Sequence, residues 1–138
     1  MVENTVCIIG LGWLGTALYQ HYHSHDIPVI GTRTSEAGVR EMRDEGMRAF
    51  LLNLTPGSQS DDWKSWFHCQ NLVINIPPGR KDPDVETRYP KQVEQLVGMA
   101  ETAGVERIIF VSSTSVFSGA NGAVDDNTAV QPATNSGR

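Results

Sequence analysis

This sequence has few cysteines, no long apolar run and no excess of positive charge, and each absence narrows what the protein can be. Two cysteines, Cys7 and Cys69, are too few for a disulfide framework. No apolar stretch approaches the length that spans a membrane, and the acidic start Met1-Val2-Glu3 is not a signal peptide. A net charge of −5 disfavours nucleic acid and anionic membranes as partners. We therefore expect a cytoplasmic protein without either partner.

What the chain does have is a glycine turn between a strand pattern and a helix pattern. The apolar run Val6-Cys7-Ile8-Ile9 leads directly into Gly10-Leu11-Gly12-Trp13-Leu14-Gly15, which has the G-x-G-x-x-G spacing. A glycine allows the sharp turn at position 10, close approach of a pyrophosphate at position 12, and close packing of helix on strand at position 15. Free amides at the helix start, with the positive end of its dipole, form an anion site. We therefore predict dinucleotide binding by Gly10, Gly12, Trp13, Leu14 and Gly15; a purely structural turn is the alternative.

The end of the second predicted strand lies where the adenosine ribose is expected, about 20 residues after the glycines. This position carries Thr32-Arg33-Thr34 instead of the acidic residue that accepts from a ribose 2′-hydroxyl. A guanidinium pairs well with a 2′-phosphate, and flanking hydroxyls add hydrogen bonds. We therefore predict NADP as the preferred cofactor, with NAD as the alternative, although Arg33 could also be an ordinary surface residue at a turn.

Hydrophobic periodicity and turn signals predict alternating strands and helices through the rest of the chain. Strands are expected over 6–9, 28–34, 47–54, 71–76 and 107–111, and helices over 16–25, 35–45, around 63–67 and over 90–103. Short connections in this alternation predict an α/β, doubly wound (Rossmann) parallel sheet of five strands in the order 3-2-1-4-5, with helices on both faces. A ligand would then bind at the carboxyl ends of the strands, beside the first one.

Several polar residues have structural explanations. Ser35 is predicted to cap the helix that Gly46 ends, and Asp61-Asp62 to cap the helix that carries Trp63, Trp66 and Phe67. The segment 80–88 reads as a loop. His21 and His25 stand at i, i+4 spacing, but no carboxylate or cysteine pattern joins them, so no metal site is predicted.

After the fifth strand comes Ser112-Ser113-Thr114-Ser115-Val116-Phe117-Ser118-Gly119. With the glycine turn, Arg33 and the Ile76-Pro77-Pro78 exit of the fourth strand, this segment resembles the extended short-chain dehydrogenase/reductase family, the NAD(P)-dependent epimerases and dehydratases. The resemblance covers the whole chain. It implies that Ser113 binds the reacting oxygen of the substrate and that Asn53, Ile76, Pro77 and Ser112 line the cofactor. It further implies a nucleotide sugar or similar small polar metabolite as substrate.

The chain departs from this family at the catalytic pair, Tyr-x-x-x-Lys. Ser136 falls where the tyrosine belongs, and the lysine would lie beyond Arg138. A serine hydroxyl is a far weaker acid than the tuned tyrosine that hydride-transfer chemistry needs. We therefore expect residues 1–138 alone to be inactive and to be the NAD(P)-binding, N-terminal part of a longer enzyme whose substrate-binding part is absent.

Three other functions stay open. The missing tyrosine favours a non-catalytic NAD(P)-binding or redox-sensing module. Gly-Leu-Gly with Arg-Thr after the second strand is typical of β-hydroxyacid dehydrogenases, although the serine segment argues against them. An S-adenosylmethionine methyltransferase would need a ribose-binding acid where Arg33 stands. A homodimer is a further expectation, because the fifth strand and one side of the 90–103 helix would otherwise lack cover.

Overall fold

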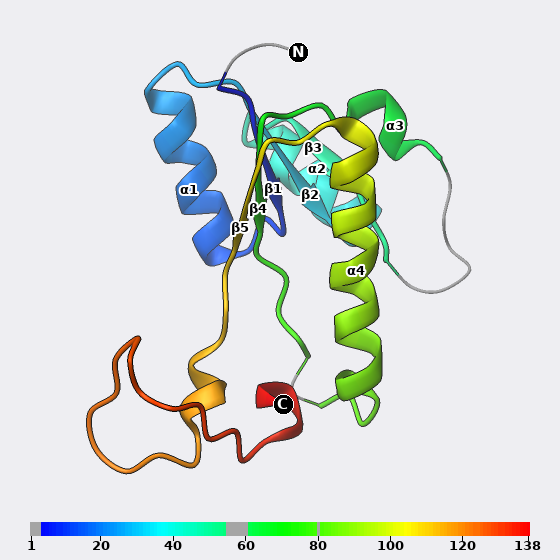
Figure 1. Cartoon of the computed structure of the whole chain (residues 1–138). Coiled ribbons are helices and arrows are strands. Elements are labelled where there is room, and N and C mark those ends of the chain that lie inside the picture. The colour runs from blue at the N-terminus through cyan, green and yellow to red at the C-terminus, as the bar shows by residue number, and fades with distance from the viewer. Residues whose placement is uncertain (1–3, 55–60, 80) are drawn as a thin grey trace. The chain divides into compact units, whose positions relative to one another are not determined.

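The computed structural model describes residues 4–54, 61–79 and 81–138, and it contains the five-stranded parallel sheet that the sequence predicts. The strands are β1 (Val6–Ile9), β2 (Val29–Arg33), β3 (Ala49–Leu51), β4 (Asn71–Ile74) and β5 (Arg107–Phe110). Their order is β3-β2-β1-β4-β5 (Figure 1), and every neighbouring pair is parallel. The predicted order is therefore confirmed, and β1 lies in the middle of the sheet.

The chain divides into two compact units. The first, the sheet unit, comprises Met1–Ile76 and Gln95–Val111; the second unit comprises Pro77–Glu94 and Ser112–Arg138. The helices are α1 (Trp13–Ser24), α2 (Glu36–Asp44), α3 (Trp63–Trp66) and α4 (Val85–Ala103), and α4 contributes residues to both units. Two 3₁₀ turns, η1 (Thr114–Phe117) and η2 (Asn135–Gly137), belong to the second unit.

Two hydrophobic clusters cover the two faces of the sheet, because alternate strand residues point to opposite sides. Cys7 and Ile9 of β1 pack in the cluster that includes Leu96, Met99 and Ala100 of α4. Val6 and Ile8 pack in the cluster that includes residues of α1 and α2, which are Tyr19, Val39 and Met42. Burial on both faces explains why the central strands read as continuous apolar runs.

Two predicted helix features are confirmed and two are wrong. Ser35 caps α2 through its side chain, which accepts from the Gly38 amide, and Gly46 ends the helix with φ of 85°. The Asp62 side chain, by contrast, makes no capping bond to α3.

The segment predicted as a loop over 80–88 is already helical from Val85, and Pro90 lies inside α4. Val85 is buried, and the Asp84 carbonyl accepts from the amides of Thr87 and Arg88, so a turn of helix forms before the proline.

β5 is exposed along its whole length, unlike the other strands. Ile108, Ile109 and Phe110 are 41%, 44% and 46% exposed. The expectation that the fifth strand lacks cover is therefore confirmed for the described residues. The same expectation for one side of the 90–103 helix is wrong at Leu96 and Ala100, which are buried in the core.

Candidate functional site

The glycine turn joins β1 to α1 at the carboxyl edge of the sheet, and it fits very closely against β4. Gly10 has φ of 105°, and a Cβ there would lie 2.4 Å from the backbone oxygen of Asn75. A Cβ on Gly15 would lie 2.0 Å from the Gly10 oxygen. Gly12 is different, because a Cβ there would meet no atom within 4 Å. Positions 10 and 15 are therefore needed for packing, whereas position 12 faces open space.

Hydrogen bonds from both neighbouring strands hold the first two residues of the turn. The Gly10 amide donates to the Thr32 hydroxyl (3.1 Å), and the Leu11 amide donates to the Thr32 carbonyl (2.9 Å). Asn75 donates its side-chain amide to the Gly10 carbonyl (3.3 Å). These bonds satisfy both polar backbone groups of Gly10 from β2 on one side and the end of β4 on the other.

Arg33, at the end of β2, also supports the turn. Its Nη1 donates to the Leu11 carbonyl over 2.7 Å, and Nη2 lies 3.7 Å from the Glu41 carboxylate. The side chain is 33% exposed, so the guanidinium is accessible beside the turn. Thr32 is only 3% exposed and Thr34 is exposed. Thr32 thus has a structural role in the turn, and cofactor contacts of all three residues stay predictions.

The start of α1 has backbone amides without a side-chain cap. Its first intrahelical bond runs from the Thr16 amide to the Gly12 carbonyl (2.8 Å), so the amides of residues 12–15 have no acceptor within the helix. No side chain caps this end, and its first turn contains no acidic residue. Helix α2, in contrast, has its Ser35 cap and an acidic first turn. The uncapped amides and the helix dipole together favour a phosphate at α1.

Trp13 is the first residue of α1, and its side chain is 89% exposed. A tryptophan side chain buries a large apolar area on binding and can therefore contribute more binding free energy than most other side chains. Leu14, beside it, is half-buried. Trp13 is therefore a large exposed apolar side chain directly after Gly12 in the sequence.

The remaining predicted cofactor residues lie at the ends of other strands. Asn53 follows β3 and is exposed, and Ile76, two residues beyond β4, is half-buried at the end of the sheet unit. Pro77 and Ser112 belong to the second unit, and both are exposed. Their predicted roles remain predictions.

In the second unit, the serine segment has a local structure of its own. Ser113 caps η1, its hydroxyl accepts from the Ser115 amide (3.1 Å), and it lies 2.8 Å from the Ser115 hydroxyl. Ser136 lies in η2, 3.3 Å from the Thr134 hydroxyl. Within the described residues, the side chains of these two serines contact other hydroxyls and one backbone amide. Neither serine therefore has an evident base within this part of the chain.

The sequence did not predict two polar side chains that hold neighbouring segments together through hydrogen bonds. Asn75 is one; an asparagine that closes an otherwise apolar strand beside the glycine turn was the available signal. Arg88 is the other: it pairs with Asp82 and donates to the Pro78 carbonyl (2.6 Å) and to Gln92 (2.8 Å). The bond from Arg88 lowers the pKa of the Asp82 carboxyl.

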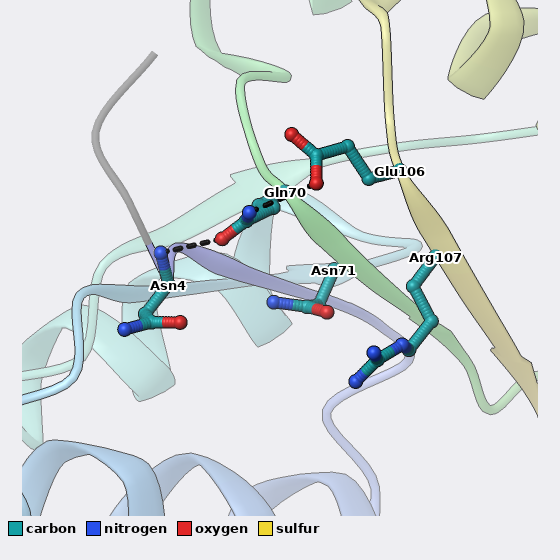
Figure 2. Close-up of a pocket in the computed structure, with 5 residues that line it drawn as sticks. All are labelled: Asn4, Gln70, Asn71, Glu106 and Arg107. Atoms are coloured by element: carbon teal, nitrogen blue, oxygen red, sulfur yellow. Dashed lines mark hydrogen bonds between the residues drawn. The ribbon is translucent and has the colours of Figure 1, made fainter.

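A shallow polar cavity of about 190 Å³ lies at the opposite edge of the sheet unit (Figure 2). Its lining residues stand before or at the starts of β1, β4 and β5: Asn4, Gln70, Asn71, Glu106 and Arg107. Gln70 links them, because its side chain accepts from the Asn4 amide (2.7 Å) and donates to Glu106 (2.9 Å). Since the glycine turn follows the other end of β1, this cavity is not part of the candidate cofactor site.

Other chemistry-bearing groups form no site. The described ranges contain no group of three or more His, Cys, Asp or Glu side chains that could hold a metal ion. They also contain no helix with the length and apolar character that crossing a bilayer requires. Cys7 and Cys69 are free and fully buried, and burial raises the pKa of the Cys7 thiol well above its usual range.

Comparison with solved structures identifies the fold. UDP-galactose 4-epimerase superposes with a TM-score of 0.77 at 16% identity, over 96% of this chain and 46% of that one. The Bordetella bronchiseptica enzyme WbmG, solved with NAD and UDP, gives 0.72 at 20% identity, over 96% and 45%. A short-chain dehydrogenase/reductase superfamily protein from Agrobacterium tumefaciens with bound NAD gives 0.74 at 18%, over 96% and 40%. The chain has a Rossmann fold.

This Rossmann chain corresponds to part of each protein that it resembles. Protein YeeZ of Escherichia coli K12 is 39% identical over 135 residues, which are 96% of this chain and 49% of YeeZ. YeeZ of Escherichia coli O157:H7 matches equally well, and no protein-family model matches the chain. The chain therefore spans about half the length of the curated relatives it matches, and its resemblance to the epimerases holds for the fold of a Rossmann portion.

Proposed function

We propose that this chain binds a nicotinamide dinucleotide, preferably NADP, as the cofactor-binding part of an epimerase/dehydratase-type protein. The substrate of the whole protein would be a nucleotide sugar or another small polar metabolite. WbmG, which was solved with UDP, and UDP-galactose 4-epimerase, which is named for a uridine nucleotide sugar, share the Rossmann fold. These two proteins support the substrate class as a hypothesis for this chain.

The observation that carries the proposal is the uncapped start of α1 beside an open Gly12. The turn is held by bonds to Gly10 and Leu11, which leaves the amides of residues 12–15 for a ligand. Because a Cβ at position 12 would meet nothing within 4 Å, the space in front of this backbone admits a bulky anion. A pyrophosphate has the charge and the acceptor atoms that such a site selects.

The neighbouring residues fit the rest of a dinucleotide. Arg33 supports a 2′-phosphate, because its guanidinium is one-third exposed beside the turn and carries donors beyond the one used by Leu11. Trp13, the first residue of α1, is an exposed aromatic side chain that could contact a bound dinucleotide. Once bound, the nicotinamide would supply hydride transfer, while the chain's own residues anchor the phosphates and orient the molecule.

A second candidate, a nucleotide-binding module without turnover, is favoured by one observation. Within the described residues of the second unit, the Ser113 and Ser136 side chains bond to hydroxyls and a backbone amide and not to a basic side chain. A serine in this setting does not supply the acid/base that hydride chemistry needs. Turnover measured beside binding separates the two candidates.

The first test measures NADPH and NADH affinities of the purified chain by fluorescence titration at moderate salt. A charge-assisted contact predicts NADPH tighter by about 1–3 kcal/mol, which is roughly 5- to 150-fold. Arg33→Gln should remove most of this difference. Arg107→Gln, which loses the same charge at the opposite edge of the sheet, should leave it unchanged. Equal affinities for the wild type would contradict the NADP preference, and binding of neither would contradict the proposal itself. Steady NADP-dependent conversion of a nucleotide sugar by this chain alone would exclude the module.

A further inference from the structure

Arg33 is shared between the glycine turn and helix α2. Nη1 donates to the Leu11 carbonyl over 2.7 Å, a short and well-formed bond. Nη2 faces the carboxylate of Glu41 on α2 at 3.7 Å, which is too long for a hydrogen bond but within range of an ion pair. One nitrogen is therefore firmly held, and the other is loosely paired.

The Arg33 side chain passes close to the first turn of α2. A Cβ at Gly38 would lie 2.8 Å from Arg33 Nε and 3.3 Å from Arg33 Cβ, so a larger residue at position 38 would make the arginine side chain shift. Gly38 is in the first turn of α2, and its amide is already used by the Ser35 hydroxyl. The guanidinium thus lies against α2, while the cap consumes one donor that a phosphate could otherwise use.

Glu41 is the acidic partner within reach of this guanidinium, and it is 62% exposed. An exposed pair at this separation is weak, so an incoming anion can displace the carboxylate. The bond to Leu11 uses one of the two N–H groups of Nη1, so a 2′-phosphate would bind mainly at the Nη2 end of the guanidinium, which now faces Glu41. The phosphate and the carboxylate would compete for the positive charge at that end, and NAD, which has no phosphate there, would not be affected.

We propose that Glu41 is a specificity-determining residue, whose carboxylate competes with the 2′-phosphate for Arg33 and so limits the preference for NADP over NAD. This inference rests on the dinucleotide site proposed above. Arg33 has two effects, because its loss would remove both the phosphate contact and the hydrogen bond to the Leu11 carbonyl. Substitution of Glu41 would change the phosphate contact and leave the hydrogen bond to Leu11 in place.

The expected effect is modest because the pair is exposed. Exposed ion pairs correspond to factors of roughly 1.5 to 5 in an equilibrium constant. We therefore expect Glu41→Gln, which keeps the size of the side chain, to tighten NADPH binding about three-fold. NADH affinity should stay as in the wild type. The gain should shrink as salt is raised, because exposed charges are screened.

The experiment titrates NADPH and NADH into the wild type, Glu41→Gln, Arg33→Gln and the double variant. Glu45→Gln is the control, because it removes the same charge at the far end of α2, beyond the last helical residue. In the Arg33→Gln background, Glu41→Gln should no longer tighten NADPH binding. An unchanged NADPH affinity in Glu41→Gln, an equal gain for NADH, or the same gain without Arg33 would each overturn the competition. If the wild type binds neither nucleotide, the proposed function fails; if it binds both and only the ratio is unmoved, this inference alone fails.

Discussion

Substitutions at Gly12 and at Gly15 should affect binding and stability differently. Gly12→Val should keep the fold and lose the dinucleotide, whereas Gly15→Ala should lose stability. The difference follows from what a Cβ meets at each position: nothing within 4 Å at Gly12, and the Gly10 oxygen at 2.0 Å at Gly15. If the glycine motif served only packing, substitutions at Gly12 and at Gly15 would both lower the stability of the fold.

The magnitudes follow from backbone conformation and contact. Gly12 has φ of −83° and ψ of −159°, an extended conformation at negative φ that does not require glycine, so the cost should be mainly that of valine at an N-cap, about 1 kcal/mol at most. At Gly15 the backbone must move, which costs about 1–3 kcal/mol in a packed site, against about 1 kcal/mol gained in helix propensity. The melting temperature should therefore fall by up to about 8 °C.

The assay combines thermal melting with NADPH titration on each variant. Gly98→Ala is the matched control, because Gly98 lies in α4 with nothing within 4 Å of an added Cβ. It should stabilise the chain by about 0.5–1 kcal/mol and leave binding unchanged. Gly12→Val should weaken NADPH binding at least about 100-fold, since a side chain fills the space the pyrophosphate needs. If Gly12→Val binds NADPH as tightly as the wild type, the pyrophosphate binds elsewhere. If Gly12→Val lowers the melting temperature as much as Gly15→Ala does, the space in front of Gly12 is not open.

Two further predictions concern residues behind the site. Asn75→Ala removes the side-chain donor to the Gly10 carbonyl, so the free energy of unfolding should fall by about 1 kcal/mol and NADPH binding should weaken several-fold. Asn75→Asp keeps the shape of the side chain but places an acceptor against that carbonyl, so it should weaken NADPH binding more. A normal NADPH affinity for Asn75→Asp would contradict the role of Asn75. Cys7 and Cys69 should not react with a thiol reagent in the folded chain even at pH 9, because both are fully buried. Burial also raises the pKa of Cys7, whereas the interaction with Cys7 lowers the pKa of Cys69, so the protection of Cys69 comes from burial alone. Both should react once guanidinium unfolds the chain, and rapid native-state labelling would contradict their burial.

Much of the fold could be predicted from the sequence, because the signals that begin and end its strands and helices act between residues close together in the chain. The apolar run before Gly10, the Ser35 cap and the Gly46 stop each act within a few residues, and each lies where predicted. The start of α4 did not follow, because the rule that proline begins a helix is only a tendency. Here Asp84 accepts two amide bonds ahead of Pro90, and the buried Val85 anchors the added turn.

The site itself was only half predictable, since its positions are local but its contacts are not. Spacing placed Arg33 near the glycines, yet its partners Leu11 and Glu41 come from the turn and from α2. Asn75 was not singled out because its task depends on β4 pairing with β1, which brings residues far apart in sequence together. A glycine motif read from sequence predicts where the chain turns; the ends of two neighbouring strands decide which of its amides stay free. In this chain those ends bind Gly10 and Leu11 and leave the start of α1 without a cap, and that division is the physical reason to expect an anion there.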